Sequence, residues 1–181
     1  SKGLTKPACL IPISKLEFPQ FYYCSFEGRL TGEVFRFFQR VVVNYTSYCP
    51  CSASLCTHLL MSKGHGGFPH AQRSSADVLV EVNLPSVLWL EEIIEIVEKA
   101  VVNIPIPILR RVDEQEFARI AGENPMFVED AIRFISDGLD KENRIFDWIV
   151  KCVHEESIHT HEAIAINWKG IRGGFDGLKF L

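Results

Sequence analysis

The change of hydrophobic period near Pro85 is the feature that most constrains the fold. Before it, β-branched and aromatic side chains dominate residues 33–47, and residues 74–84 alternate between apolar and polar positions. Both patterns are typical of strands. After it, residues 87–101 place apolar side chains at helical spacing, with glutamates available for the opposite face. The sequence therefore predicts two paired strands followed by a helix that has Pro85 in its first turn.

The middle of the chain predicts two more helices. Prolines within residues 103–109 end the first helix, and residues 113–122 form a short second one. The next helix is expected to have Asn124 as its cap, Pro125 in its first turn and Gly138 as its stop. Its buried stripe is expected to consist of Phe127, Val128, Ala131, Ile132 and Ile135.

The end of the chain predicts a second hairpin. Residues 144–157 and 158–168 are rich in β-forming side chains and are joined by a short polar bend. The resulting order favours one α+β domain over residues 1–181, with helices on one face of an antiparallel sheet. The glycine-rich segment between the first two strands, residues 51–69, is expected to be a loop with at most a short helix at its start.

Composition narrows the range of partners. The net charge of -4 disfavours nucleic acid, because duplex binding rests on a basic surface. Charged side chains such as Arg40 and Glu91 interrupt the apolar runs before they reach the roughly 20 residues that a membrane span needs. The N-terminus lacks the apolar core of a secretory signal. We therefore expect a cytoplasmic protein that binds neither nucleic acid nor membrane.

Three of the six cysteines gather within eight residues, at Cys49, Cys51 and Cys56. A disulfide framework, a metal site, a catalytic thiol and core packing are all open explanations. In a reducing compartment, clustered cysteines favour metal ligands or reactive thiols over disulfides. If this segment is extended, Cys49 and Cys51 project on the same side and supply one or two ligands. The isolated cysteines are expected to pack as small apolar side chains: Cys9, Cys24 and Cys152.

A second cluster of potential metal ligands lies in the bend of the second hairpin. If residues 158–160 begin a strand, His159 and His161 project on one side, although a solvated turn is the alternative. His70, just before a predicted strand, completes a mixed sulfur, nitrogen and oxygen set that suits a catalytic divalent metal. His58 and His65 are expected to be exposed. The cluster consists of His154, Glu155, Glu156, His159 and His161.

Five motifs follow one another along the chain: "SYCPCS", "PHAQRS", "DEQEFAR", "ENPMFVED" and "EESIHTHEA". Together they resemble the type IB branch of GTP cyclohydrolase I over roughly Val41 to Trp168. The resemblance implies the tunnelling fold, or T-fold, in a homo-oligomer, expected to be a tetramer, with active sites between subunits. It also implies that the chain lacks part of the family's N-terminal region, and that the Cys49 to His70 interval is longer than in the shortest members.

The resemblance implies conversion of GTP and water to 7,8-dihydroneopterin triphosphate and formate. This pterin begins folate (tetrahydrofolate) biosynthesis and, in bacteria, the synthesis of queuosine-type tRNA bases. A divalent metal ion is implied, zinc first and manganese or iron as alternatives, because such an ion with an open position activates water. The implied ligands are Cys49, His70, His159 and, as a variable fourth, Glu114.

The resemblance also assigns catalytic and substrate-binding residues. Glu129 is expected to accept the two parallel N–H donors of guanine, with complementation of a helix dipole as the alternative. His161 is a candidate acid or base, or else it orients His159. Glu156 assists the metal or the substrate, so the expected catalytic set is Cys49, Glu156 and His161. The candidate triphosphate contacts are Arg73, Arg110 and Arg111. The alternative for each is an ordinary surface arginine.

Two other functions remain open. A non-catalytic T-fold protein that binds a purine or a metal would bind GTP without turnover. A T-fold thiol enzyme of the nitrile reductase type would use Cys51 as a covalent nucleophile. The histidine and glutamate motifs favour the metal hydrolase, so Cys51 is expected to lie beside the metal ligands without reacting.

Overall fold

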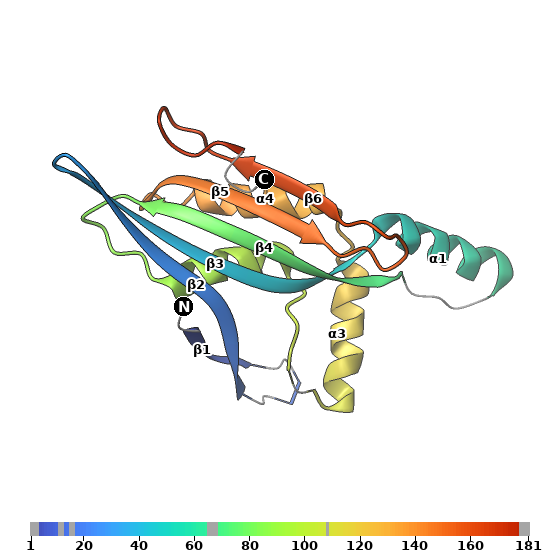
Figure 1. Ribbon diagram of the computed structural model, residues 1–181. Coiled ribbons are helices and arrows are strands. Elements are labelled where there is room, and N and C mark those ends of the chain that lie inside the picture. Colours follow the sequence, from blue (N-terminus) through green and yellow to red (C-terminus); the bar gives the residue numbers. More distant parts are fainter. Residues whose placement is uncertain (1–3, 11–12, 15–16, 65–68, 108, 178–181) are drawn as a thin grey trace.

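The computed structural model describes residues 4–10, 13–14, 17–64, 69–107 and 109–177, and it shows an α+β architecture (Figure 1). Its antiparallel strands follow the order β1-β2-β3-β4-β5-β6, and β2 pairs with β1 through its first part and with β3 through its second. The strands are β1 (Leu4–Leu10), β2 (Glu17–Thr31), β3 (Val34–Tyr48), β4 (Ala71–Val82), β5 (Ile145–His154) and β6 (Ala163–Trp168). The helices are α1 (Pro50–Lys63), α2 (Leu90–Val101), α3 (Arg111–Glu123) and α4 (Val128–Asp140).

The centre of the sheet is formed by β3 and β4, which pair from Phe37↔Val82 to Tyr48↔Ala71. Successive side chains of a strand point to opposite faces, and those on one face here include buried valines and Tyr45. On the other face, Arg40 forms an ion pair with Asp77 across the two strands. The predicted strand pairing is therefore confirmed, whereas β1 and the first part of the sheet were not predicted.

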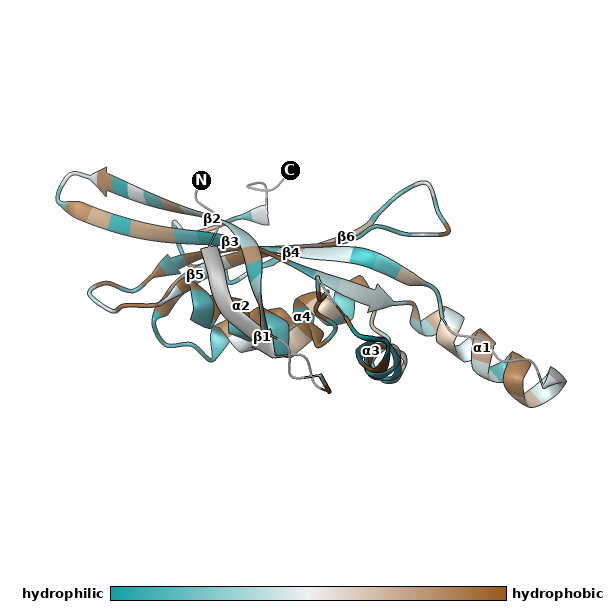
Figure 2. Ribbon diagram, turned by 90° about the horizontal axis from the view of Figure 1, so that it is seen from below, coloured by the Kyte–Doolittle hydropathy of each residue, from teal (hydrophilic) through white to brown (hydrophobic). Residues whose placement is uncertain are grey.

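Helices α2 and α4 cover the apolar face of the sheet, and none of the described helices lies on the opposite face (Figure 2). Their apolar stripes are buried, and full burial of each such side chain stabilises the fold by about 1.5–3 kcal/mol. Gly138 lies inside α4 and does not end it. A Cβ atom there would meet Ile96 Cγ2 of α2 at 2.7 Å, so this glycine permits the close approach of the two helices.

Several predicted helix boundaries were wrong. Pro85 follows a cis peptide bond in the turn that precedes α2, which begins only at Leu90. Asn124 ends α3, where its side-chain amide donates to the Ile120 carbonyl at 2.7 Å. Phe127 precedes the first turn of α4, where its backbone N–H donates to the Asp130 carboxylate at 3.1 Å, and its side chain is 43% exposed instead of buried in the stripe.

The segment between β3 and β4 is a 14-residue helix for most of its length, which corrects the predicted loop. Pro50 stands in its first turn, and no glycine or further proline interrupts the chain before Gly64, which adopts a left-handed φ of 63° at the C-terminus. This helix, α1, projects from the end of the sheet in both views (Figures 1 and 2). His58 on α1 is exposed, as expected, whereas His65 lies outside the described residues.

The described helices are 12 to 14 residues long. Within the described ranges, none has the length and apolar character that crossing a bilayer requires.

Candidate active site

A pocket of about 370 Å³ lies where the ends of β3, β4 and β5 meet the first turns of α1 and α4. Figure 1 shows that α1 and the β5–β6 connection lie at this same end of the sheet. Cys51, Gln72 and His154 contribute to the lining. It also contains six of the residues predicted for the site: Cys49, His70, Glu129, Glu156, His159 and His161.

Backbone hydrogen bonds bring these distant segments together. The Tyr48 carbonyl accepts from the Met126 N–H at 3.0 Å, which ties the end of β3 to the start of α4. The Glu155 N–H donates to the Arg73 carbonyl at 2.8 Å, which ties the β5–β6 connection to β4. Because both bonds involve residues next to the pocket, the fold fixes the positions of its walls.

The two clustered thiols lie at the start of a helix, not in an extended segment. Cys49 precedes the first turn of α1, and Cys51 lies within that turn beside Pro50. The prediction that alternation in a strand would align the two thiols was therefore wrong. Both side chains nevertheless line the pocket, Cys49 half-buried and Cys51 exposed. Cys152 is buried in the core, as predicted, Cys24 is half-buried, and the side chain of Cys9 lies outside the described residues.

His70 presents one ring nitrogen that has no partner. Its Nδ1 is hydrogen-bonded to the Ser157 hydroxyl at 2.9 Å, and its backbone N–H donates to the Ser52 hydroxyl at 3.3 Å. Its Nε2 is buried and lacks a hydrogen bond among the described residues. A buried nitrogen without a partner is costly, so its lone pair is suited to a bound ligand or ion.

His159 and His161 lie in the bend before β6, which begins only at Ala163. The prediction that a strand begins at residues 158–160 was therefore wrong. The two imidazoles are stacked, with ring centroids 5.1 Å apart and an interplanar angle of 16°. Both rings consequently lie on one side of the connection, where they line the pocket.

The pocket floor is a hydrogen-bonded network of buried side chains. His154 Nε2 lies 2.9 Å from the Tyr45 hydroxyl, and His154 Nδ1 lies 3.4 Å from Gln72 Nε2. The same amide nitrogen donates to Glu156 Oε1 at 2.9 Å. Burial lowers the pKa of His154 to about 4, although the charges of Glu156 and Glu129 act in the opposite direction. The imidazole is therefore neutral at pH 7.

Two predicted site residues do not line this pocket. Arg73 lies in β4 between Gln72 and Ser74, whose buried side chains point to the helix-covered face, so the exposed Arg73 side chain points to the opposite face. Glu114 is exposed in the first turn of α3. Their assignments as triphosphate contact and fourth metal ligand remain predictions.

The residues of the pocket fit a divalent transition metal in chemical type. A thiol with imidazoles and carboxylates is the mixed donor set that zinc and related ions bind, and the unpartnered Nε2 of His70 provides one free donor. Among the residues that the structure describes, no three His, Cys, Asp or Glu side chains already stand at ligand spacing around one point. The ligand set therefore remains a prediction supported by the chemistry of the lining.

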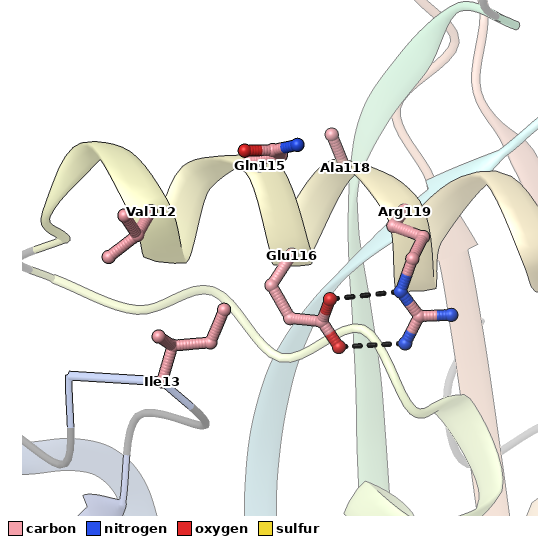
Figure 3. Close-up of a pocket in the computed structure, with 6 residues that line it drawn as sticks. All are labelled: Ile13, Val112, Gln115, Glu116, Ala118 and Arg119. Carbon is pink, nitrogen blue, oxygen red and sulfur yellow. Dashed lines mark hydrogen bonds and ion pairs between the residues drawn. The ribbon is translucent and has the colours of Figure 1, made fainter.

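A larger pocket of about 580 Å³ lies between residue 13 and α3 (Figure 3). Its polar side chains include Glu116 and Arg119, which form an ion pair at 2.7 Å and thereby satisfy each other. The described lining contains neither a thiol nor an imidazole. The thiol and imidazole side chains therefore lie in the smaller pocket, which is the candidate active site.

Gln72 and Phe127 are pocket residues that the sequence analysis did not assign to the site. Gln72 is 5% exposed and contacts both His154 and Glu156. Its position two residues after His70 on a strand was the available signal, because such residues share a face. Phe127 was expected in the buried stripe of a helix, but its exposed ring lies at the pocket.

These features define a class: an α+β protein whose sheet ends in a pocket of thiol, imidazole and carboxylate side chains. The family model for "Type I GTP cyclohydrolase folE2" matches residues 9–165. The chain belongs to this family.

Curated relatives named GTP cyclohydrolase FolE2 agree with this assignment. The protein of Cereibacter sphaeroides (strain ATCC 17029 / ATH 2.4.9) is 36% identical over 151 residues, which are 83% of this chain and 42% of the relative. That of Roseobacter denitrificans is 38% identical over 152 residues, 83% of this chain and 41% of the relative. That of Paracoccus denitrificans is 39% identical over 126 residues, 70% of this chain and 39% of the relative. The chain thus spans about two-fifths of the length of these relatives.

Proposed function

We propose that this chain carries out the GTP cyclohydrolase I reaction, in which GTP and water give 7,8-dihydroneopterin triphosphate and formate at the entry to folate biosynthesis. Family membership supports the proposal, as do the names of its relatives. The observation that carries it is the convergence in one pocket of six predicted site residues from four distant motifs. The proposal includes a T-fold homo-oligomer, expected to be a tetramer, in the cytoplasm.

Cys49, His70 and His159 are the side chains that would hold a divalent ion, with zinc as the first choice and manganese or iron as alternatives. The Ser157 hydroxyl orients His70 so that Nε2 presents its lone pair to the pocket. Glu114, exposed on α3, is the proposed fourth ligand, to be reached from a neighbouring subunit or by a shift of α3. When bound, the ion supplies Lewis acidity for the addition of water to the purine.

The carboxylates and the remaining imidazole have substrate and proton-transfer roles in this proposal. Glu129, exposed in the first turn of α4, accepts the N1–H and the exocyclic amine of guanine with its two oxygens. His161, stacked on His159, moves protons during ring opening and formate release. Glu156 also lines the pocket, and its Oε1 accepts a hydrogen bond from Gln72 of the buried network. Arg73 is retained as a triphosphate contact only within an oligomer, because it points to the open face of the sheet.

The test is a GTP turnover assay combined with elemental analysis on the same sample of the full chain. We expect a bound divalent metal, release of formate, a fluorescent pterin after oxidation, and loss of both products with a strong chelator. The Cys49→Ala variant should lose turnover and metal, whereas Cys56→Ala, a change in the same helix away from the pocket lining, should retain both. Metal-loaded protein that binds GTP without releasing formate would replace the enzyme with a non-catalytic purine-binding protein.

The thiol enzyme is a second candidate because Cys51 is exposed and lines the same pocket. It predicts NADPH consumption with a nitrile substrate and loss of that activity in Cys51→Ala. Under the cyclohydrolase proposal, Cys51→Ala retains its metal and no NADPH is consumed.

A further inference from the structure

The network beneath the pocket joins four side chains from three strands and a connection. Tyr45 comes from β3, Gln72 from β4, His154 from β5, and Glu156 from the β5–β6 connection. Of these, only Glu156 has a predicted catalytic role. The other three are buried at 1%, 5% and 1% exposure, respectively, so packing holds each of them in place.

The donors of this network run outward from the Gln72 amide in two directions. The Gln72 amide nitrogen carries two hydrogens, one donated to Glu156 Oε1 and the other to His154 Nδ1. Since Nδ1 of the neutral ring is then the acceptor, Nε2 carries the hydrogen and donates to the Tyr45 hydroxyl. That hydroxyl donates in turn to the Cys152 thiol. The N–H groups of Gln72 and His154 and the Tyr45 hydroxyl therefore each have an acceptor, whereas the Gln72 Oε1 has no partner among the described residues. This assignment follows from the hydrogen-bond pattern.

The reverse orientation of Gln72 is disfavoured. It would place the amide oxygen against the Glu156 carboxylate, so that two acceptors would face each other without a hydrogen between them. A protonated His154 would likewise point an N–H at the amide nitrogen that it now accepts from. The neutral His154 ring thus fixes the orientation of the Gln72 amide, and this amide holds Oε1 of Glu156. The other carboxylate oxygen of Glu156 is left for the pocket.

We propose that Gln72 is a positioning residue that holds the Glu156 carboxylate in its working orientation, and that His154, anchored on Tyr45, holds Gln72. The expected change in kcat rests on the proposed function. The expected position of the Glu156 carboxylate does not depend on it. Partners that orient catalytic groups from behind typically change activity by about 10- to 100-fold when removed. The effect falls on kcat, because Gln72 acts through Glu156 and not through uniform binding of the substrate.

The experiment compares Gln72→Met with Gln39→Met. Gln39 is an equally buried glutamine, at 5% exposure, on the same face of the neighbouring strand β3. Its amide donates to the Leu88 carbonyl at 2.9 Å and does not line the pocket. Both variants lose a buried amide of the same size, so the comparison separates positioning from a general loss of packing. Unfolding midpoints measured for both confirm that they fold.

We expect Gln72→Met to lower kcat for GTP by about 10- to 100-fold with a smaller change in KM, and Gln39→Met to change kcat less than about threefold. Crystal structures should show the Glu156 carboxylate displaced in Gln72→Met alone. Gln72→Glu, which keeps the acceptors and removes the donors, should resemble Gln72→Met in activity. Equal kcat values for the two methionine variants, or full activity of Gln72→Glu, overturn the inference.

The structural readout keeps the inference separate from the proposed function. If the wild-type chain releases no formate, the cyclohydrolase proposal fails, and the crystal structures still decide whether Gln72 positions Glu156. A carboxylate that keeps its place in Gln72→Met overturns the inference even when the wild-type chain is active.

Discussion

Tyr45 and His154 meet edge to face beneath the pocket, with ring centroids 5.6 Å apart and the hydroxyl 2.9 Å from Nε2. They belong to β3 and β5, which are separated by β4, so the contact crosses the central strand of the sheet on its helix-covered face. When a buried imidazole donates to a neutral hydroxyl, this hydrogen bond stabilises the protonated ring only slightly more than the neutral ring. The burial that lowers the pKa of His154 therefore links this contact to the acid stability of the fold.

The first prediction concerns that pH dependence. The folded-state pKa of His154, about 4, lies below the ordinary histidine value of 6.5, so the unfolded chain binds the proton more readily. The contribution of His154 to stability is then fully present above pH 6.5 and is lost as the pH falls from 6.5 towards 4. The shift corresponds to at most about 3 kcal/mol. Urea unfolding at pH 7, 5.5 and 4.5 should show this loss in the wild-type chain.

The groups that face His154 are Tyr45 and Gln72, which hydrogen-bond its ring, and the charged Glu156 and Glu129, which oppose the effect of burial. His154→Gln should therefore be less stable at pH 7 and should lose less stability on acidification. His58→Gln serves as the control, because His58 is exposed on α1. An acid dependence that survives in His154→Gln unchanged would falsify the assignment.

The second prediction concerns the orientation of His70. The Ser157 hydroxyl bonds Nδ1, so Ser157→Ala should free the ring and weaken metal binding by about 10-fold or more. Competitive titration of zinc against a chromophoric chelator measures this directly and does not depend on activity. Ser62→Ala is the matched control, since its hydroxyl bonds the His58 carbonyl within α1. Identical zinc affinities of the two variants would remove His70 from the proposed ligand set.

The third prediction uses two helical glycines with opposite expectations. A methyl group at Gly138 would meet Ile96 Cγ2 at 2.7 Å, so Gly138→Ala should destabilise the fold by about 1–3 kcal/mol. A methyl group at Gly122 in α3 meets nothing within 4 Å, so Gly122→Ala should stabilise it by up to about 1 kcal/mol through helix propensity. Chemical denaturation of the two variants should give changes of opposite sign. A neutral Gly138→Ala would mean that α2 and α4 separate at little cost.

Strands β3 to β6 could be predicted because the side-chain pattern of a strand is a local signal, whereas β1 and β2 were not predicted. The same alternation that buries Gln72 and Ser74 turns Arg73 to the opposite face. The orientation of Arg73 could therefore be predicted from the sequence once His70 was placed at the pocket. The 14-residue length of α1 was not predicted, although a short helix at the start of the segment was allowed. The glycines that follow residue 63 suggested a loop, and the apolar side chains of α1 spread around the helix without a stripe. Exposed Leu55 and Met61 illustrate this spread.

The sequence motifs identified the six predicted residues of the pocket. They did not identify the hydrogen-bonded network of Tyr45, Gln72 and His154 beneath it. A motif marks residue types with evident chemistry, such as thiols and imidazoles. The contact between Gln72 and Glu156 depends on the strand register that aligns Ser74 with His154 across β4 and β5. Register of this kind is set by long-range pairing and cannot be read from either strand alone.

The last prediction separates the two interpretations of Glu129. If Glu129 accepts the two donors of guanine, Glu129→Gln should lower kcat/KM for GTP by about 100-fold, because one acceptor is replaced by a donor facing a donor. If it only complements the dipole of α4, the same change should cost about 0.3–1 kcal/mol of stability and leave kcat/KM unaltered.

Asp130 is the neighbouring control for Glu129. It lies in the same turn, but its carboxylate accepts from the Phe127 N–H at 3.1 Å and pairs with Arg133. Asp130→Asn should therefore reduce stability without changing the preference for GTP over ATP, which a binding assay with both nucleotides measures. If only Glu129→Gln loses that preference, Glu129 in the first turn of α4 binds the purine. If both variants lose it, the effect comes from the charge at the helix end and not from Glu129 itself.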